Sequence, residues 1–297
     1  MRVFVTGASG FIGSAIVEEL IHADHQVLGL VRSDSAAGSL AAAGAQVQRG
    51  DLEDLESLRS GAARCDAVIH TAFIHDFSKF KENSEIDRRA IEALGDTLAG
   101  SDRPFIVTSG IGVFAPGHRT TEEDVLPPGY NVTPRVSEQT AVSMVARGVN
   151  ASVVRLPQVH DPFKQGLVSY LIAVAREKGV SAYVGDGLNR WPAVHRLDAA
   201  LLYRLALEKG SAGARYHAVA EEGVPLREIA EAIGRGLKIP VVARSPEEAA
   251  GHFGFLGSFV GMDILASSAL TQEWLDWRPG HGGLIADLDL FFHTFTV

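Results

Sequence analysis

Three glycines near the N-terminus have the spacing of a dinucleotide-binding turn. The segment "VFVTGASGFIGSAIVEEL" carries them as G-x-x-G-x-x-G, directly after an apolar run typical of a strand and directly before a helical pattern. The first glycine permits a tight turn, the second lets the backbone approach a pyrophosphate, and the third lets the helix pack on the strand. Backbone N–H groups at the start of the helix would bind the phosphates. The predicted contacts of a nicotinamide cofactor here are Gly7, Ser9, Gly10, Phe11, Ile12 and Gly13.

The end of the second expected strand indicates which dinucleotide this turn serves. An NAD site usually has an acid about 20 residues past the glycines, where it binds the ribose 2′-OH. Here Val31 stands in that place, followed by Arg32 and Ser33. A guanidinium matches the 2′-phosphate of NADP, so we expect NADP, with NAD less favoured but left open by Asp34. In the alternative interpretation Arg32 is a solvated loop residue, and Ser33 or Asp34 caps the next helix.

Two later strand ends are expected to lie against the same cofactor. Asp51 and Leu52 follow the third strand, where an adenine edge would lie. Thr71 and Ala72 end the fourth strand, where the backbone would pass near the pyrophosphate. Both assignments depend on the fold. Without it, Asp51 would be a helix cap and His70 an ordinary buried polar residue.

The order of the elements that must position these residues favours a parallel sheet. Up to about residue 160, short runs rich in valine and isoleucine alternate with helical patterns. This order is typical of a Rossmann-type doubly wound α/β sheet that is covered on both faces. Helical patterns follow at 166–179, 196–210, 225–240 and 267–279, with one strand-like run at 214–220. We predict an NADP-binding domain over residues 1–160 and a smaller C-terminal α/β substrate part over 161–297, closely packed and contributing elements to the first.

Several further motifs resemble those of one enzyme family. "DAVIHTA" ends in the His-x-Ala of a family strand, and "VVRLPQV" at 153–159 is similar to another strand. "VHRLDAA" at 194–200 matches Val-His-Val-Asp-Asp-Val-Ala at four positions, and "WLDWRP" at 274–279 resembles Leu-Gly-Trp-x-Pro. Together with the glycine turn, they make the chain resemble the short-chain dehydrogenase/reductase superfamily, specifically its extended and atypical members of the NAD-dependent epimerase/dehydratase type. The resemblance implies a Rossmann sheet, a smaller part that shapes the substrate pocket, and NAD(P)-dependent carbonyl or alcohol chemistry.

The expected catalytic helix departs from the pattern of this family. The family places a tyrosine there as proton donor and, four residues later, a lysine that lowers the pKa of the tyrosine and binds the nicotinamide ribose. In "PRVSEQTAVSM" these two positions hold Pro134 and Glu138, and no lysine stands between Lys81 and Lys164. We expect no catalytic role for Glu138, because a carboxylate would raise the pKa of a nearby tyrosine.

Three other residues could supply or hold the proton. Tyr130 lies one turn before the position of the family tyrosine, on a Pro-Pro-Gly loop, and is the first candidate. His195 follows a glycine loop at 183–198, and Ser109 ends the fifth strand beside Thr108, a predicted cofactor contact. Ser109 could hold a water molecule, a substrate oxygen or the nicotinamide carboxamide. In the structural alternatives, Ser109 satisfies backbone groups and His195 orients the loop before its helix.

Two further segments could shape a pocket. Arg190 beside Trp191 suits an anionic or planar ligand. Residues 251–263 are rich in glycine and phenylalanine, and they are interpreted either as a flexible apolar lid or as a packed loop.

Composition limits the class of partner. The net charge of −9 over 297 residues argues against a general nucleic-acid binder. The single cysteine, Cys65, can form no intrachain disulfide, which fits a reducing compartment. No run of about 18 apolar residues predicts a membrane span. We expect a cytoplasmic monomer or homodimer that acts on a small-molecule carbonyl or alcohol, without nucleic acid, membrane or metal.

The leading hypothesis is an NADP(H)-dependent oxidoreductase that reduces a small aldehyde or ketone and lacks the usual tyrosine–lysine pair. One alternative is a nucleotide-sugar epimerase or dehydratase, which needs transient oxidation by tightly held NAD, and Arg32 counts against it. The other alternative is an NADP(H)-binding redox sensor without turnover, which the altered catalytic helix favours.

Overall fold

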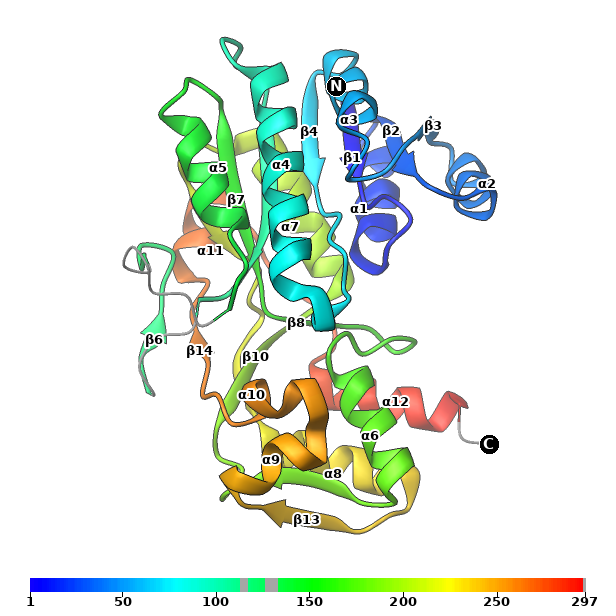
Figure 1. The fold of residues 1–297 in the computed structure, drawn as a ribbon, viewed down its shortest axis with the longest axis vertical. Helices are drawn as coiled ribbons and strands as arrows, with labels where there is room; N and C mark the ends of the chain where they lie inside the picture. Colours follow the sequence, from blue (N-terminus) through cyan, green and yellow to red (C-terminus); the bar gives the residue numbers. More distant parts are fainter. Residues whose placement is uncertain (113–116, 126–132, 296–297) are drawn as a thin grey trace.

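The computed structural model describes residues 1–112, 117–125 and 133–295, and within these a seven-stranded parallel sheet forms the centre of the larger part (Figure 1). Each neighbouring pair of its strands is parallel. In spatial order the strands are β11 (Arg215–His217), β7 (Ala151–Leu156), β5 (Phe105–Gly110), β4 (Ala67–His70), β1 (Arg2–Thr6), β2 (Gln26–Val31) and β3 (Gln46–Arg49). This arrangement confirms the Rossmann-type doubly wound fold expected from the sequence.

The direction in which strands are added reverses between β1 and β4. From β1 the chain adds β2 and β3 on one side, then returns to β4 and adds β5, β7 and β11 on the other side. Sheets of this type bind ligands in the crevice at the carboxyl ends of the strands where the order reverses. Thr6 and His70, the last residues of β1 and β4, are paired in register there. The loops after these two strands are therefore placed to form the cofactor site.

Two layers of helices cover the sheet because its strands are apolar on both faces. In β1, Val3 and Val5 belong to one buried core and Phe4 to the other. The first core includes side chains of α1 (Phe11–His22), α2 (Asp34–Ala42) and α7 (Arg196–Lys209). The second includes side chains of α3 (Leu55–Ala63), α4 (Phe80–Leu98) and α5 (Ser137–Val145). A short 3-10 helix, η1 (Phe77–Lys79), precedes α4.

A smaller part with its own apolar core lies below the carboxyl ends of the strands in Figure 1. Its strands form a three-stranded sheet of β12, β10 and β8 and a pair of β13 with β9. The strands are β8 (Gln158–His160), β9 (Ser181–Val184), β10 (Arg190–His195), β12 (Glu221–Pro225) and β13 (Val241–Arg244). The helices are α6 (Val168–Lys178), α8 (Leu226–Leu237), α9 (Pro246–Phe253), η2 (Gly254–Leu256), α10 (Gly257–Val260) and α12 (Leu284–Phe295). α6 ends at Gly179, whose φ of +69° suits a glycine.

The chain passes more than once between the two parts. Although both follow residue 160, β11 is an edge strand of the larger sheet and α7 packs on one face of that sheet. β14 (Leu265–Ala266) pairs with β6 (Arg119–Thr120), and α11 (Ala269–Leu275) follows it. The division into residues 1–160 and 161–297 stays a prediction. Residues 251–263 form short helices that bury Phe253, Leu256 and Val260, as the packed-loop interpretation has it.

Candidate cofactor and catalytic site

The glycine turn is tightly packed between β1, α1 and the loop after β4. Gly7 has a φ of +69°, which a side chain disfavours. A Cβ on Gly7 would stand 2.7 Å from Thr71 Oγ1 and 2.8 Å from the backbone nitrogen of Ala72. A Cβ on Gly13 would stand 2.0 Å from the carbonyl oxygen of Gly7. Packing inside the protein therefore requires glycine at both positions.

Gly10 differs because the space beside it is open. Its φ is −76°, and a Cβ there would meet only the carbonyl oxygen of Gly7, at 3.0 Å. α1 begins at Phe11 without a side-chain cap, so the backbone N–H groups of Phe11 and Ile12 are left free by the helix. Ser9, just before Gly10, is exposed. Open space, free N–H groups and the positive end of a helix dipole all fit a pyrophosphate.

Thr71 and Ala72 hold the loop after β4 against this turn. Thr71 Oγ1 donates to the carbonyl oxygen of Thr6 at 2.7 Å, and the backbone N–H of Ala72 donates to Thr6 Oγ1 at 3.4 Å. Their backbone therefore lies beside the position expected for the pyrophosphate. The predicted contacts from the loop after β4 and from the glycine turn thus meet in one place.

The end of β2 presents an unpaired arginine. Arg32 is exposed and has no ion-pair partner among the residues that the structure describes. Ser33 caps α2, because its side chain accepts from the backbone N–H of Ala36 at 3.2 Å. Asp34 pairs with Arg49, the last residue of β3, so the acid next to the site is already engaged. At the end of β2 the arginine is thus left free, while the acid two residues later is engaged.

Asp51 and Leu52 lie just after β3. Asp51 Oδ1 accepts from the backbone N–H groups of Glu53 at 2.8 Å and Asp54 at 3.0 Å, which closes a local turn. Asp54, and not Asp51, caps α3. Leu52 is buried in the core under α3 and α4. The role of both residues at the adenine edge stays a prediction.

Glu138, in the position of the family lysine, forms a double ion pair inside the protein. Its carboxylate accepts from Arg155 Nε at 2.8 Å, from Arg155 Nη2 at 2.7 Å and from Arg215 Nε at 2.7 Å. Burial alone would raise its pKa, but the two arginines lower it below the usual value. Glu138 therefore joins α5 to β7 and β11, and its role is structural.

A buried chain of hydrogen bonds connects the start of α5 with the end of β1. Ser137 Oγ donates to Asp87 Oδ2 at 2.5 Å, and the other carboxylate oxygen of Asp87 lies 3.0 Å from His70 Nε2. His70 Nδ1 lies 2.8 Å from Thr6 Oγ1, which in turn accepts from the Ala72 N–H. Burial opposes the charge of Asp87, yet bonds from His70 and Ser137 lower its pKa.

Arg135 extends this chain at its outer end. Its Nε donates to Ser137 Oγ at 2.9 Å, its Nη2 donates to the carbonyl oxygen of Thr108 at 3.1 Å, and its guanidinium lies 4.6 Å from the centre of the Phe73 ring. Burial lowers its pKa and the charge of Asp87 opposes this shift, but an arginine remains protonated. Sequence reasoning assigned no role to Arg135 or Asp87, because they come from separate elements and show no periodic signal.

The two hydroxyls at the end of β5 point to opposite faces of the sheet. Thr108 Oγ1 lies 2.6 Å from the hydroxyl of Tyr203 on α7, inside the core. Ser109 is paired in register with Arg155, whose side chain contacts α5 on the other face. The hydroxyl of Ser109 has no hydrogen-bond partner within the described ranges. Ser109 is thus free to hold a ligand oxygen, while the hydroxyl of Thr108 is already occupied.

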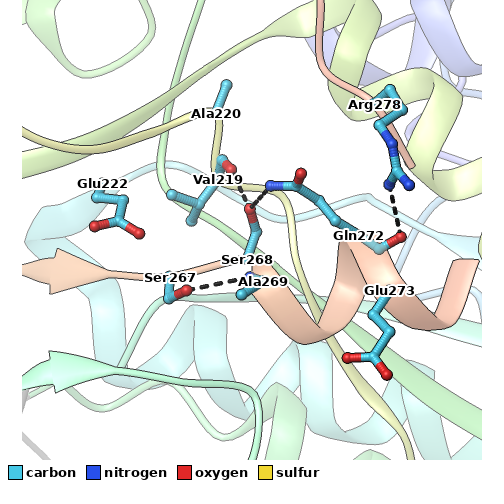
Figure 2. A pocket seen from close by; sticks show the side chains of 9 residues that line it. All are labelled: Val219, Ala220, Glu222, Ser267, Ser268, Ala269, Gln272, Glu273 and Arg278. Carbon is cyan, nitrogen blue, oxygen red and sulfur yellow. Dashed lines mark hydrogen bonds between the residues drawn. The ribbon is translucent and has the colours of Figure 1, made fainter. Parts of the chain in front are cut away.

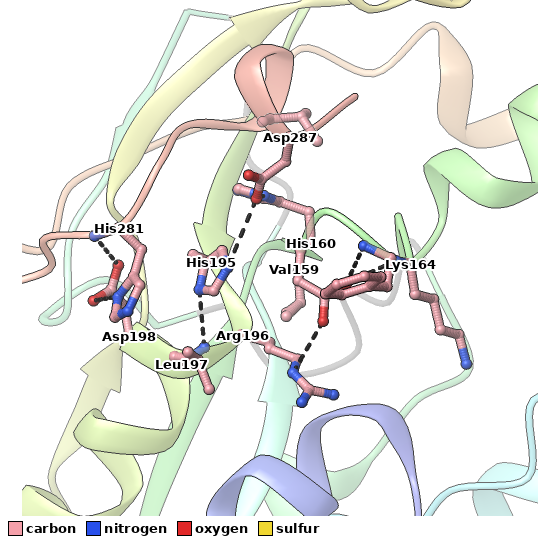
Figure 3. Close-up of polar contacts among 12 residues, drawn as sticks. Val159, His160, Lys164, His195, Arg196, Leu197, Asp198, His281 and Asp287 are labelled. Carbon is pink, nitrogen blue, oxygen red and sulfur yellow. Dashed lines mark hydrogen bonds and ion pairs between the residues drawn. The ribbon is translucent and has the colours of Figure 1, made fainter. Parts of the chain in front are cut away.

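His195 caps α7 and lies in a cluster of histidines and acids (Figure 3). Its Nδ1 accepts from the backbone N–H of Leu197 at 3.2 Å, and its ring stacks on His281 with 4.6 Å between centres. Its Nε2 is 3.8 Å from Asp287 Oδ2. Burial lowers the pKa of His195, against the charge of Asp287. This geometry favours the structural interpretation, and a catalytic role for His195 stays a prediction.

Tyr130, the first candidate for the proton donor, lies outside the described residues. The segment 183–198 is not the glycine loop expected from the sequence, because Arg190–His195 form β10. Arg190 pairs with Asp263 at 2.8 Å, and Trp191 is buried in the core of the smaller part. Neither side chain is free for the anionic or planar ligand considered from the sequence.

A cavity of about 490 Å³ is lined by residues of β12 and α11 and of the segments next to them (Figure 2). It is lined by Val219, Ala220, Glu222, Ser267, Ser268, Ala269, Gln272, Glu273 and Arg278. Several of its polar groups bond to each other. Ser268 Oγ donates to the carbonyl oxygen of Val219 at 2.5 Å and accepts from Gln272 Nε2 at 3.0 Å. We assign no cofactor function to this cavity.

Among the described residues, no helix is long and apolar enough to span a membrane, and no group of three or more His, Cys, Asp or Glu side chains is arranged to hold a metal ion. The fold and the glycine turn define a Rossmann-type protein with a site for a nicotinamide dinucleotide.

Comparison with known proteins gives the family. The profile of the NAD-dependent epimerase/dehydratase family matches residues 3–220, and the chain belongs to this family. It is an NAD(P)-dependent oxidoreductase of the extended short-chain dehydrogenase/reductase type.

An uncharacterised protein of Schizosaccharomyces pombe is 51% identical over 295 residues, which cover 98% of this chain and 100% of that protein. The sterol-4-alpha-carboxylate 3-dehydrogenase, decarboxylating, of Dictyostelium discoideum is 29% identical over 76% of this chain and 73% of its own length. The structure of UDP-glucose 4-epimerase from Thermotoga maritima aligns with a TM-score of 0.77 at 20% identity, covering 100% of this chain and 99% of that one. The last comparison concerns the fold alone.

Proposed function

We propose that the chain is an NADP(H)-dependent reductase of a small aldehyde or ketone. When bound, the nicotinamide supplies or accepts a hydride, and the protein contributes binding, orientation and electrostatics. The observation that carries the proposal is the pairing of an open pyrophosphate cradle at Gly10 with a free arginine at the end of β2. Relatives that are named as a sterol-4-alpha-carboxylate 3-dehydrogenase and as a ketoreductase support the same class of chemistry.

NADP is the proposed cofactor because of how the charges at the ends of β2 and β3 are used. Arg32 is free, whereas Asp34, the acid that could bind a ribose 2′-OH, is held by Arg49. Val31 on β2 and Arg49 on β3 are paired in register, so Arg49 lies directly beside the end of β2 that precedes Arg32. A 2′-phosphate placed there would meet one free guanidinium and displace Asp34 from another.

The proton for the reduced oxygen must come from outside the usual tyrosine position, because Pro134 has none to give. Ser109 is the described residue best placed to hold a water molecule or the substrate oxygen, since its hydroxyl is free at the end of β5. Tyr130 stays the alternative donor. Replacing each in turn, as Ser109→Ala and Tyr130→Phe, should lower the rate at least about tenfold for the one that acts. Full activity in both variants would leave bulk water as the donor.

The cofactor is tested by titrating NADPH and NADH into wild type and Arg32→Ala. Losing a charged partner of the phosphate costs roughly 1.5–3 kcal/mol, so the variant should bind NADPH at least about tenfold more weakly and NADH unchanged. Arg59→Ala, which removes an arginine on α3 that forms a surface pair with Glu56, is the matched control. Equal affinity of wild type for the two cofactors would contradict the NADP assignment.

The reaction is tested by a screen of aldehydes and ketones with NADPH and with NADH, following absorbance at 340 nm. Turnover with NADPH supports the reductase. Interconversion of sugar nucleotides without net use of cofactor would indicate the epimerase or dehydratase alternative. Tight NADPH binding with no turnover of either kind would favour a redox sensor.

A further inference from the structure

Arg135 uses only part of its guanidinium in hydrogen bonds to the residues that the structure describes. A guanidinium carries five N–H donors. Arg135 spends one on Ser137 Oγ and one on the carbonyl oxygen of Thr108. The other three, including both on Nη1, have no partner in the part of the chain that the structure describes. The residue as a whole is half-buried.

Arg155, one strand away on β7, shows the opposite pattern. Its Nε and Nη2 bind the carboxylate of Glu138, Nη2 also reaches the carbonyl oxygen of Asp124, and Nη1 bonds to His217 Nε2 and the carbonyl oxygen of Thr121. Every N–H of Arg155 therefore has a partner in the protein. Arg155 therefore has no donor left for a ligand, whereas Arg135 does.

The position of Arg135 follows from the layout of the site. Arg32, at the end of β2, marks the adenosine side of the crevice, and the start of α1 marks the pyrophosphate. The other half of a dinucleotide must then lie on the opposite side of β1, over the ends of β4 and β5. Arg135 is fixed there, because it bonds to Thr108 on β5 and stacks on Phe73, the residue after Ala72.

Arg135 is also held rigidly before any ligand arrives. Phe73 supports one face of the guanidinium, and Ser137, which accepts from Arg135, is itself bonded to the buried carboxylate of Asp87. A cation whose orientation is already fixed loses little conformational freedom on binding. The unbonded N–H groups of Arg135 can donate to oxygen acceptors. The negative charge of Asp87 stabilises the protonated guanidinium.

We propose that the open N–H groups of Arg135 hold the ribose hydroxyls of the nicotinamide half of the bound cofactor. Arg135, the residue after Pro134, thereby supplies the positive charge that the family lysine would supply at the position of Glu138. The inference rests on the nicotinamide-cofactor part of the proposed function and does not depend on any particular substrate.

The test compares a whole cofactor with its adenosine half. Wild type, Arg135→Met and Arg135→Lys are titrated with NADPH and with adenosine 2′,5′-bisphosphate, which lacks the nicotinamide ribose. Arg135→Met should bind NADPH at least about tenfold more weakly, as for the loss of hydrogen bonds to a charged group, and the bisphosphate within twofold of wild type. Arg135→Lys should restore most of the NADPH affinity. Arg147→Met, which removes an exposed arginine just past the other end of α5, should change neither affinity.

Two results would overturn the proposal while leaving the cofactor assignment intact. One is unchanged NADPH affinity in Arg135→Met, and the other is an equal loss for NADPH and the bisphosphate, which would mean a general disturbance of the site. If wild type binds neither NADPH nor NADH, the proposed function fails together with this inference. If Arg135→Met does not fold, as judged by its thermal unfolding, Arg135→Gln takes its place, because its amide can still donate to the carbonyl oxygen of Thr108.

Discussion

At the residue scale, identical residue types in this protein serve different ends according to what surrounds them. Gly7 and Gly13 are glycines because a Cβ would collide with backbone atoms. Gly10 has no such neighbour except the carbonyl oxygen of Gly7. We therefore propose that glycine is required at this position chiefly by the cofactor, whose pyrophosphate would occupy the open space.

Gly10→Val tests whether glycine is needed at this position for folding or for binding the cofactor. The valine would fill the space that the pyrophosphate needs. The affinity for NADPH should therefore fall by at least about a hundredfold, which is more than the loss of one hydrogen bond to a charged group would cause. The fold should persist, with a small loss of stability from the 3.0 Å contact. Gly251→Val on α9, where a Cβ would meet no described atom within 4 Å, is the matched control. Retained NADPH binding by Gly10→Val would remove the basis for the site.

At the element scale, α5 keeps its place in the fold although the family's catalytic pair is absent. Its first turn supplies Ser137 to the buried chain that ends at Thr6, and Glu138 to the ion pairs with β7 and β11. Glu138, which stands in the position of the lysine, therefore holds α5 against the sheet through ion pairs. Under the proposed function, the chemistry would be supplied by neighbours such as Ser109.

Glu138→Gln should destabilise the protein strongly. Removing one member of a buried ion pair leaves the other charge uncompensated, which costs about 3–5 kcal/mol, and the side chain of Arg155 is 2% exposed. Urea unfolding at pH 7.5 measures the change. Glu231→Gln, which breaks an exposed pair with Arg227 on α8, should cost less than about 1 kcal/mol. A loss as small in Glu138→Gln as in this control would contradict the structural role.

At the scale of the whole molecule, the buried His217 connects the larger sheet to the segment that contains Ser267. His217 on β11 has Nε2 3.0 Å from Arg155 Nη1 and Nδ1 2.7 Å from the carbonyl oxygen of Ser267. An arginine can only donate, so Nε2 accepts and Nδ1 carries the proton, and the ring is neutral. Burial, followed by the charge of Arg155, lowers the pKa of His217 to about 4, although Glu138 and Asp124 act in the other direction.

This arrangement predicts that stability falls as the pH is lowered. The unfolded chain binds a proton at His217 near its ordinary pKa, whereas the folded protein binds it only near pH 4. The stabilisation is therefore complete above about pH 6.5 and is lost between there and about pH 4. Between pH 7.5 and 5.0 the loss from this residue should be about 2 kcal/mol.

Urea unfolding of wild type and His217→Gln across this range checks the prediction. The variant is expected to be less stable at pH 7.5, and its stability should fall less steeply toward pH 5. His22→Gln, which removes an exposed histidine on α1, should leave the slope unchanged. A wild-type slope that persists in His217→Gln would assign it to other groups, such as His160, whose pKa burial also lowers to about 4.

The sequence by itself determined the sheet, the glycine turn and the likeness to the family, because these depend on residues close together in the chain. Apolar runs of strand length, the spacing of Gly7, Gly10 and Gly13, and the glycine after α6 act within one or two elements. The absence of the tyrosine and lysine was equally plain from the sequence, as was the basic end of β2.

Only the tertiary structure decided what the remaining polar residues do. Glu138 meets Arg215 from 77 positions away, and Thr108 meets Tyr203 from 95 positions away. Arg135 reaches the crevice through contacts with β5 and the loop after β4. The role of a charged or hydroxyl side chain depends on which of its donors and acceptors are already bonded and how far it is buried. Both are set by elements distant in the sequence, so no local pattern could have distinguished the occupied Arg155 from the open Arg135.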